Sequence, residues 1–141
     1  MRKSTLIAAG LLAGAVAWHA GQAAQTTYKA TLSGKSEVPP VAGNGSGSAT
    51  VTADPATKQV SWTVTYSGLS GPAAAAHIHC GAAAGANAGV AVSLGSNLAS
   101  PIKGSAAMTD AQLADLSAGK CYVNIHTAAN KGGEIRGQLA P

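Results

Sequence analysis

Charged residues are scarce in this chain of 141 residues, at 10% of the sequence, and they form no runs. Nine basic residues stand against five acidic ones, and two of the basic residues, Arg2 and Lys3, lie at the N-terminus. Without those two, seven basic and five acidic residues remain, and the formal net charge falls from +4 to +2. Because binding to phosphate backbones needs clustered basic side chains, the sequence predicts no nucleic-acid partner.

Long hydrophobic segments are also lacking, apart from one near the N-terminus. Residues 6–18 are apolar, follow the two basic residues and precede small residues that end near Ala23 or Ala24. This run is short for a membrane-spanning helix and contains two glycines. We therefore predict a signal peptide over residues 1–24 and one exported domain over residues 25–141, periplasmic or secreted, with no transmembrane anchor after cleavage.

The usual patterns of hydrolytic and phosphate-binding sites are missing as well. No Ser-His-Asp arrangement and no paired carboxylates can be recognised. The glycine-rich stretches 81–89 and 127–133 lack the Gly-Lys-Ser/Thr ending of a phosphate-binding loop. These absences exclude the common hydrolase and nucleotide-binding classes.

What the sequence does contain is a series of short strands separated by Gly, Pro, Asn and Ser. Residues 60–66 alternate between apolar side chains at even positions and hydroxyl side chains at odd positions, which indicates a sheet with one wet face. Thr109 and Gln112 have capping-box spacing and predict one short helix that ends near Gly119. The fold class is therefore all-β, an antiparallel Greek-key sandwich or flattened barrel of about eight strands with one short connecting helix. The expected strands are 27–33, 47–53, 59–67, 75–80, 89–94, 102–108, 120–127 and 133–139.

Three histidines, His77, His79 and His126, are the only ones beyond the predicted signal peptide. Residues i and i+2 of a strand share a face, so His77 and His79 should project together. If strand 120–127 is the neighbour of strand 75–80, His126 joins them. Three neutral imidazoles at one point form a site for copper or zinc. The alternative is that each histidine is simply a solvated or hydrogen-bonded side chain on a polar face.

Other polar residues share the predicted histidine face. Tyr122 and Asn124 have the parity of His126, and Arg136 in the last strand also points outward by the period of two. A guanidinium beside a metal ion would hold small anions by forked hydrogen bonds. We therefore predict Arg136, Asn124 and Tyr122 as anion-guiding or second-sphere residues. The alternative for Arg136 is an exposed arginine paired with Glu134 or with water.

The two cysteines, Cys80 and Cys121, share the inward parity of the apolar residues in their strands. An exported protein meets an oxidising compartment, and an even number of cysteines favours pairing. A bond between them would close a loop of about forty residues and stabilise the fold by roughly 4 kcal/mol. The alternative is that Cys80 is a thiolate ligand to a metal beside His79.

Distinctive motifs run along most of the chain after the predicted signal peptide, at residues 28–34, 37–40, 45–47, 62–69, 76–79, 122–127 and 132–138. With these motifs the chain resembles the CHRD domain, the module first described in chordin. The resemblance implies an exported β-sandwich without a settled biochemical activity. This sequence departs from the usual pattern where many members have Gly after His-Ile-His and an aromatic residue before Tyr-Val-Asn-Ile-His, since both positions are cysteine here.

The order of the histidines is also similar to that in copper/zinc superoxide dismutases, with His77, His79, His126 and Arg136 in corresponding order. The bridging histidine and zinc ligands of that family have no counterpart, so this resemblance implies a copper-only centre.

Three functions follow as hypotheses. The first is a binding module with a three-histidine copper or zinc site and another exported protein or matrix component as partner. The others are a copper-only dismutase-like redox enzyme and a metal-free adhesion or matrix module.

Overall fold

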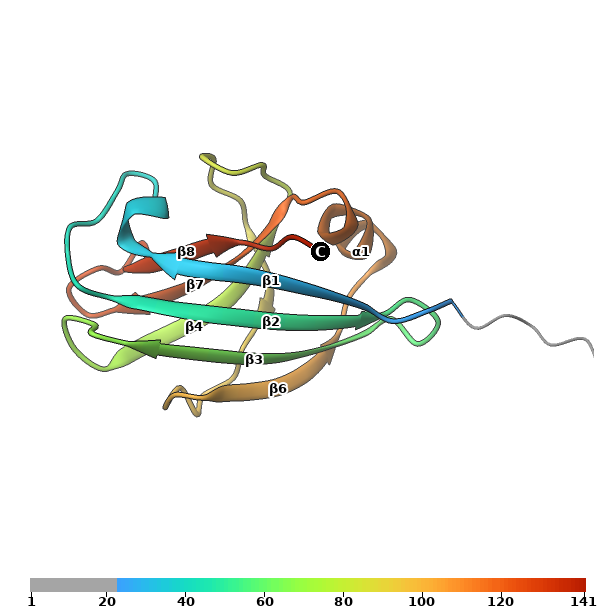
Figure 1. The fold of residues 1–141 in the computed structure, drawn as a ribbon, viewed down its shortest axis with the longest axis horizontal. Coiled ribbons are helices and arrows are strands. Elements are labelled where there is room, and N and C mark those ends of the chain that lie inside the picture. The colour runs from blue at the N-terminus through green and yellow to red at the C-terminus, as the bar shows by residue number, and fades with distance from the viewer. Residues whose placement is uncertain (1–22) are drawn as a thin grey trace, which may run out of the picture.

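The computed structural model describes residues 23–141, so the predicted signal peptide lies almost entirely outside the described residues. In the described part, eight antiparallel strands form one continuous sheet in the order β5-β4-β7-β8-β1-β2-β3-β6. The sheet folds over into two layers, with β1, β2 and β3 in front of β4 and β7 in Figure 1. The predicted all-β fold with one short helix is therefore confirmed. The elements are β1 (Thr26–Ser33), η1 (Gly34–Ser36), β2 (Ser46–Asp54), β3 (Gln59–Ser67), β4 (Ala73–Cys80), β5 (Val90–Ser93), β6 (Ile102–Ala107), α1 (Asp110–Ser117), β7 (Cys121–Thr127) and β8 (Ile135–Gln138).

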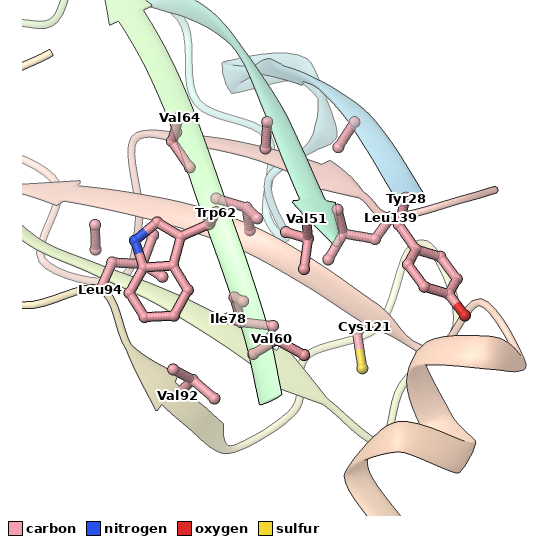
Figure 2. Close-up of a cluster of buried hydrophobic side chains, with 14 of the residues drawn as sticks. Tyr28, Val51, Val60, Trp62, Val64, Ile78, Val92, Leu94, Cys121 and Leu139 are labelled. Carbon is pink, nitrogen blue, oxygen red and sulfur yellow. The ribbon is translucent and has the colours of Figure 1, made fainter. Parts of the chain in front are cut away.

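The core lies between the two layers and follows the alternation seen in the sequence. Along β3 the apolar residues Val60, Trp62 and Val64 are buried, and the hydroxyl residues between them are exposed. Val123 and Ile125 of β7 meet them from the opposite layer, and Figure 2 shows part of this cluster. Burying one face of each strand against the other layer fixes the register of every strand.

Helix α1 connects β6 to β7 and has the predicted capping box. The Thr109 side chain accepts a hydrogen bond from the Gln112 backbone N–H, and the Gln112 side chain accepts one from the Thr109 backbone N–H. Leu116 packs into the core, and Gly119, with φ of +72°, ends the helical segment. No helix in residues 23–141 is long and apolar enough to cross a membrane.

The disulfide between Cys80 and Cys121 is confirmed. The two residues lie directly opposite one another in the β4–β7 pair, with a Cα–Cα distance of 4.1 Å. Cys121 is fully buried, whereas Cys80, expected to face the core equally, is only partly buried at the end of its strand. Both cysteine sulfurs are consumed by the bond, so the alternative of a Cys80 thiolate ligand is wrong.

The outward-facing side chains of β7 and β8 are buried rather than solvated. Tyr122, Asn124 and Arg136 have the predicted outward parity, yet each is at most 3% exposed. The loop between β4 and β5 covers Arg136 and Tyr122, as their hydrogen bonds to residues 86–88 show. Glu37 and Gly133 cover Asn124. The molecule therefore has a second, polar buried layer outside the sheet.

Glu134, expected as an outward partner of Arg136, instead fastens two loops together. Its carboxylate accepts hydrogen bonds from Ser70, both backbone and side chain, from Thr127 and from Asn130. Burial alone would raise the pKa of Glu134, but these hydrogen bonds outweigh burial and lower the pKa to about 2. The carboxylate joins the β3–β4 loop to the β7–β8 loop.

Replacing Glu134 with glutamine is expected to lower the free energy of unfolding at pH 7. A pKa lowered by folding gives stability that is present above the unfolded-state value of 4.5 and is lost as the pH falls towards 2. The shift corresponds to about 3 kcal/mol, of which solvent screening leaves roughly 1–2 kcal/mol. Urea denaturation at pH 7 and pH 3 measures the loss, and the difference between the two proteins should be clearly smaller at the lower pH. Asp110→Asn, in an exposed ion pair with Lys58, is the control and should change stability by about 0.5 kcal/mol or less. Equal losses in both variants would contradict this account.

Candidate metal centre

The three histidines predicted from the sequence meet on the outer face of β4 and β7. These strands are antiparallel neighbours, with His77 opposite Asn124 and Ala75 opposite His126. One ring nitrogen from each histidine can be chosen such that all three lie within 4.8 Å of one another. The closest pair is His77 Nδ1 and His126 Nε2, at 3.1 Å. The structure therefore brings together the three side chains that strand parity assigned to one face.

Backbone carbonyls fix the protonation pattern of two of the rings. His79 Nδ1 lies 3.0 Å from the carbonyl oxygen of Ala88, and His126 Nδ1 lies 2.9 Å from that of Lys131. A carbonyl oxygen can only accept, so each Nδ1 carries the hydrogen and each Nε2 carries a lone pair. Metal-binding histidines are oriented by this kind of hydrogen bond in many proteins.

His79 Nε2 is buried without a hydrogen-bond partner, and it is the only histidine nitrogen among the four such side-chain atoms in residues 23–141. The ring itself is only 8% exposed. A buried polar atom left without a partner costs about 1–3 kcal/mol, so such atoms are rare unless a ligand or ion completes them. The lone pair of His79 is therefore available to an ion at this position.

The protein environment favours the neutral form of the two histidines on β4. Burial lowers the pKa of His77, and the neighbouring rings of His126 and His79 lower it further. Burial also lowers the pKa of His79, and its hydrogen bond to Ala88 opposes that effect only in part. Neutral imidazoles are the form that binds metals, so protons compete weakly for these nitrogens at neutral pH.

The nitrogen separations fit one metal ion after a small movement. Zinc–nitrogen bonds are about 2.0–2.1 Å long, so two ligands of one ion lie at most about 4.2 Å apart. The pair formed by His77 and His126 already meets this limit, and the widest separation of up to 4.8 Å requires ring shifts of less than about 1 Å. An all-imidazole set suits copper or zinc, whereas magnesium and calcium prefer oxygen ligands.

Tyr122 and Arg136 support the ring of His79 from one side. The rings of His79 and Tyr122 are stacked, with centroids 4.8 Å apart and planes only 4° from parallel. The guanidinium carbon of Arg136 lies 3.5 Å from the centroid of the Tyr122 ring. Since β7 lies between β4 and β8, Tyr122 separates His79 from Arg136. The stack holds His79 in one orientation by aromatic and cation–π contacts.

Arg136 does not lie against the histidine nitrogens. Its guanidinium donates to Asn87 Oδ1 at 2.9 Å and to the carbonyl oxygen of Ala86. The alternative of an exposed arginine paired with Glu134 is wrong, because Arg136 is 2% exposed and Glu134 bonds other residues. Arg136 therefore makes no direct contact that would support the predicted anion-guiding role at the metal. The geometry instead favours a role for Arg136 in orienting His79.

Asn124 contacts a carboxyl group that the sequence did not single out. Its Nδ2 donates to Glu37 Oε1 at 2.6 Å, and Glu37 is 5% exposed. Burial raises the pKa of Glu37 to about 7, although the Asn124 hydrogen bond and the charge of Arg136 oppose the rise. The only sequence signal for Glu37 was its place in a motif of the family resemblance. Gly133 closes over this pair, since a side chain there would overlap both Asn124 and Glu37.

Comparison with known families confirms the resemblance found in the sequence. Residues 28–139 match the family model described as "CHRD domain". No curated protein and no solved structure matches the chain. The order of histidines shared with copper/zinc superoxide dismutases is therefore only a likeness of layout, which cannot carry an activity.

Proposed function

The chain belongs to the CHRD-domain family, and from that premise we propose that it is an exported binding module in which His77, His79 and His126 hold one copper or zinc ion. The observation that carries this proposal is His79 Nε2, a buried lone pair without a hydrogen-bond partner among the described residues. An ion would satisfy that atom and at the same time join β4 to β7. The ion would supply Lewis acidity or, as copper, redox chemistry.

The chain's own residues favour binding over turnover. His79 is fixed by the Ala88 carbonyl and the Tyr122 ring, and His126 is fixed by the Lys131 carbonyl. A catalyst for superoxide would need a cation beside the ion to attract its anionic substrate. Arg136, the residue predicted for that task, is bonded to the loop behind Tyr122. The copper-only dismutase hypothesis is therefore second to the binding module.

A metal-free adhesion module is the third possibility. The hydrogen bond between His77 Nδ1 and His126 Nε2 satisfies those two atoms without any ion. It leaves His79 Nε2 unsatisfied, and the free energy of burying that atom favours the metal-binding hypothesis. A centre with three protein ligands also keeps a position for an outside donor, which gives a partner protein or matrix component a point of attachment.

Titration of the purified, disulfide-bonded protein with zinc and with copper tests the proposal. We expect one equivalent to bind with an affinity that survives gel filtration, and the ring signals of all three histidines to shift together in NMR spectra. The variant with His77, His79 and His126 all replaced by alanine is the comparison and should bind none. Equal metal uptake by the two proteins, or no uptake by either, would reject the site.

The same two proteins separate a module from an enzyme. Copper-loaded protein is expected to consume superoxide no faster than the triple variant supplied with the same copper, in a stopped-flow assay. A rate that exceeds the control and falls with ionic strength would show steered catalysis and reverse the order of the two hypotheses.

A further inference from the structure

A second polar site lies beside Arg136, on the side away from the histidines. A cavity of about 500 Å³ opens there between the segment that follows β1, the β4–β5 loop and β8. No histidine lines it. Its lining includes Lys35, Glu37, Gly85, Arg136 and Gln138. A volume of this size is within the usual range for small-molecule sites, roughly 300–1,000 Å³.

The charge of Arg136 is buried without an anionic partner. The side chain is 2% exposed, its two hydrogen-bond acceptors are the neutral oxygens of Asn87 and Ala86, and its flat face rests on Tyr122. The only ion pair in residues 23–141 is that between Lys58 and Asp110, far along the chain from this cavity. Burying an unpaired charge is costly, so a cation in this state favours the entry of an anion.

The nearest carboxyl group does not neutralise Arg136. Glu37 feels the charge of the guanidinium but makes its hydrogen bond to Asn124 instead. Burial raises the pKa of Glu37 to about 7, so the carboxyl group is protonated in a large fraction of the molecules at neutral pH. A protonated carboxyl group is a hydrogen-bond donor. The cavity wall therefore presents a buried guanidinium, an exposed lysine and a carboxyl group that can donate.

We propose that this cavity binds a small organic carboxylate, which pairs with the guanidinium of Arg136 and the ammonium of Lys35. The planar fork of a guanidinium matches the two oxygens of a carboxylate. No α-helix begins at the cavity wall, so the wall lacks the helix N-terminus that many phosphate sites use. A carboxylate is thus favoured over a phosphate.

The carboxylate site is separate from the metal centre, although the two share the β4–β5 loop. Residues 84 and 85 line the cavity, Ala86 and Asn87 hold Arg136, and Ala88 holds His79. None of the carboxylate contacts requires an ion at the histidines. The two proposals can therefore fail independently, and the triple-alanine histidine variant should keep the carboxylate site.

A titration of metal-free protein with sodium succinate, followed by ¹H–¹⁵N NMR at constant ionic strength, tests the proposal. Chelators such as EDTA must be dialysed away first, since they are carboxylates themselves. We expect saturable shifts confined to amides near residues 35–38, 84–87 and 136–138. Sodium phosphate should saturate the same amides only at higher concentration. Shifts that rise linearly without saturation, or tighter binding of phosphate, would overturn the assignment.

Three variants complete the test. Lys35→Ala is expected to weaken succinate binding several-fold, and Lys103→Ala, an exposed lysine on β6, is its matched control and should leave binding unchanged. Arg136→Lys keeps the charge but removes the fork and should weaken binding at least tenfold. Equal affinities for the Lys35 and Lys103 variants would mean that only the overall charge attracts succinate, and would refute the site even if the Arg136 variant fails to fold.

Discussion

Replacing His79 with alanine is expected to lower the affinity for zinc or copper by more than about 100-fold, because loss of residues that only orient a ligand already costs 10–100-fold. Among the histidines of residues 23–141, only His79 has a buried ring nitrogen without a partner, and its ring is held by the Ala88 carbonyl and by Tyr122. Competition against a chelating dye of known affinity measures the change. Of the three single histidine variants, His79→Ala should lose the most metal affinity, since His77 and His126 already bond one another.

Thr63→Ala is the control for the His79 variant. Thr63 is exposed on β3, in the other layer of the sheet, so its removal should leave metal affinity and stability nearly unchanged. If His79→Ala binds metal as tightly as the original protein while His77→Ala and His126→Ala do not, the site would consist of those two histidines alone, and the role given to His79 would be wrong.

The convergence of the histidines could be predicted because the period of a strand is a property of the backbone. Residues i and i+2 share a face whatever surrounds them, so His77 and His79 had to project together once β4 formed. The position of His126 required one further assumption, that β4 and β7 are neighbours. The structure has that pairing.

The segments that cover the outer face of β7 and β8 could not be predicted from the alternation of residues along the strands. Tyr122, Asn124 and Arg136 alternate with core residues, so the sequence placed them on the outward face, with an exposed Arg136 as one alternative. Tyr122 and Arg136 are buried because the Gly- and Ala-rich residues 81–89 fold over them, and such a stretch has no periodicity that would reveal where it packs. Asn124 is buried by Glu37 and Gly133, which lie in irregular segments. The sequence therefore predicts the direction of these side chains but not their environment.

Several groups that determine the properties of the site were also invisible in the sequence. The carbonyl oxygens of Ala88 and Lys131 orient two histidines, yet every residue has a carbonyl and its side chain gives no sign of this role. Glu37 lies in an irregular segment after η1, a three-residue 3₁₀ helix too short to leave a pattern. Its burial depends on Asn124, which is 87 residues away in the chain.

The disulfide was predictable because two independent arguments agreed. The predicted export implies an oxidising environment, and both cysteines have inward parity in strands that were expected to pair. A metal-binding thiolate was an alternative because Cys80 directly follows His79 in the sequence. The bond to Cys121 places the sulfur of Cys80 across the sheet from β4 towards β7 and removes it as a ligand.

Replacing both Cys80 and Cys121 with alanine is expected to lower the free energy of unfolding by about 4 kcal/mol, which is the value for a closed loop of this length in the chain-entropy model. The two residues are 41 positions apart, and the bond restricts the unfolded chain over that whole segment. Alanine is preferred to serine because Cys121 is fully buried and a hydroxyl group there would lack a partner. Urea denaturation of the oxidised protein and the variant measures the difference, and a loss below about 1 kcal/mol would contradict the model.

The affinity of the folded variant for metal should change much less than its stability. If the disulfide acts mainly on the unfolded chain, β4 and β7 keep their backbone hydrogen bonds and His79 stays opposite Tyr122. Metal binding measured well below the unfolding transition should then fall less than tenfold. Chemical reduction of the original protein is the matched control and should reproduce both results. A loss of affinity as large as that of His79→Ala would instead show that the disulfide positions His79. The reason is that the metal affinity of a fully folded protein changes only if its folded state changes.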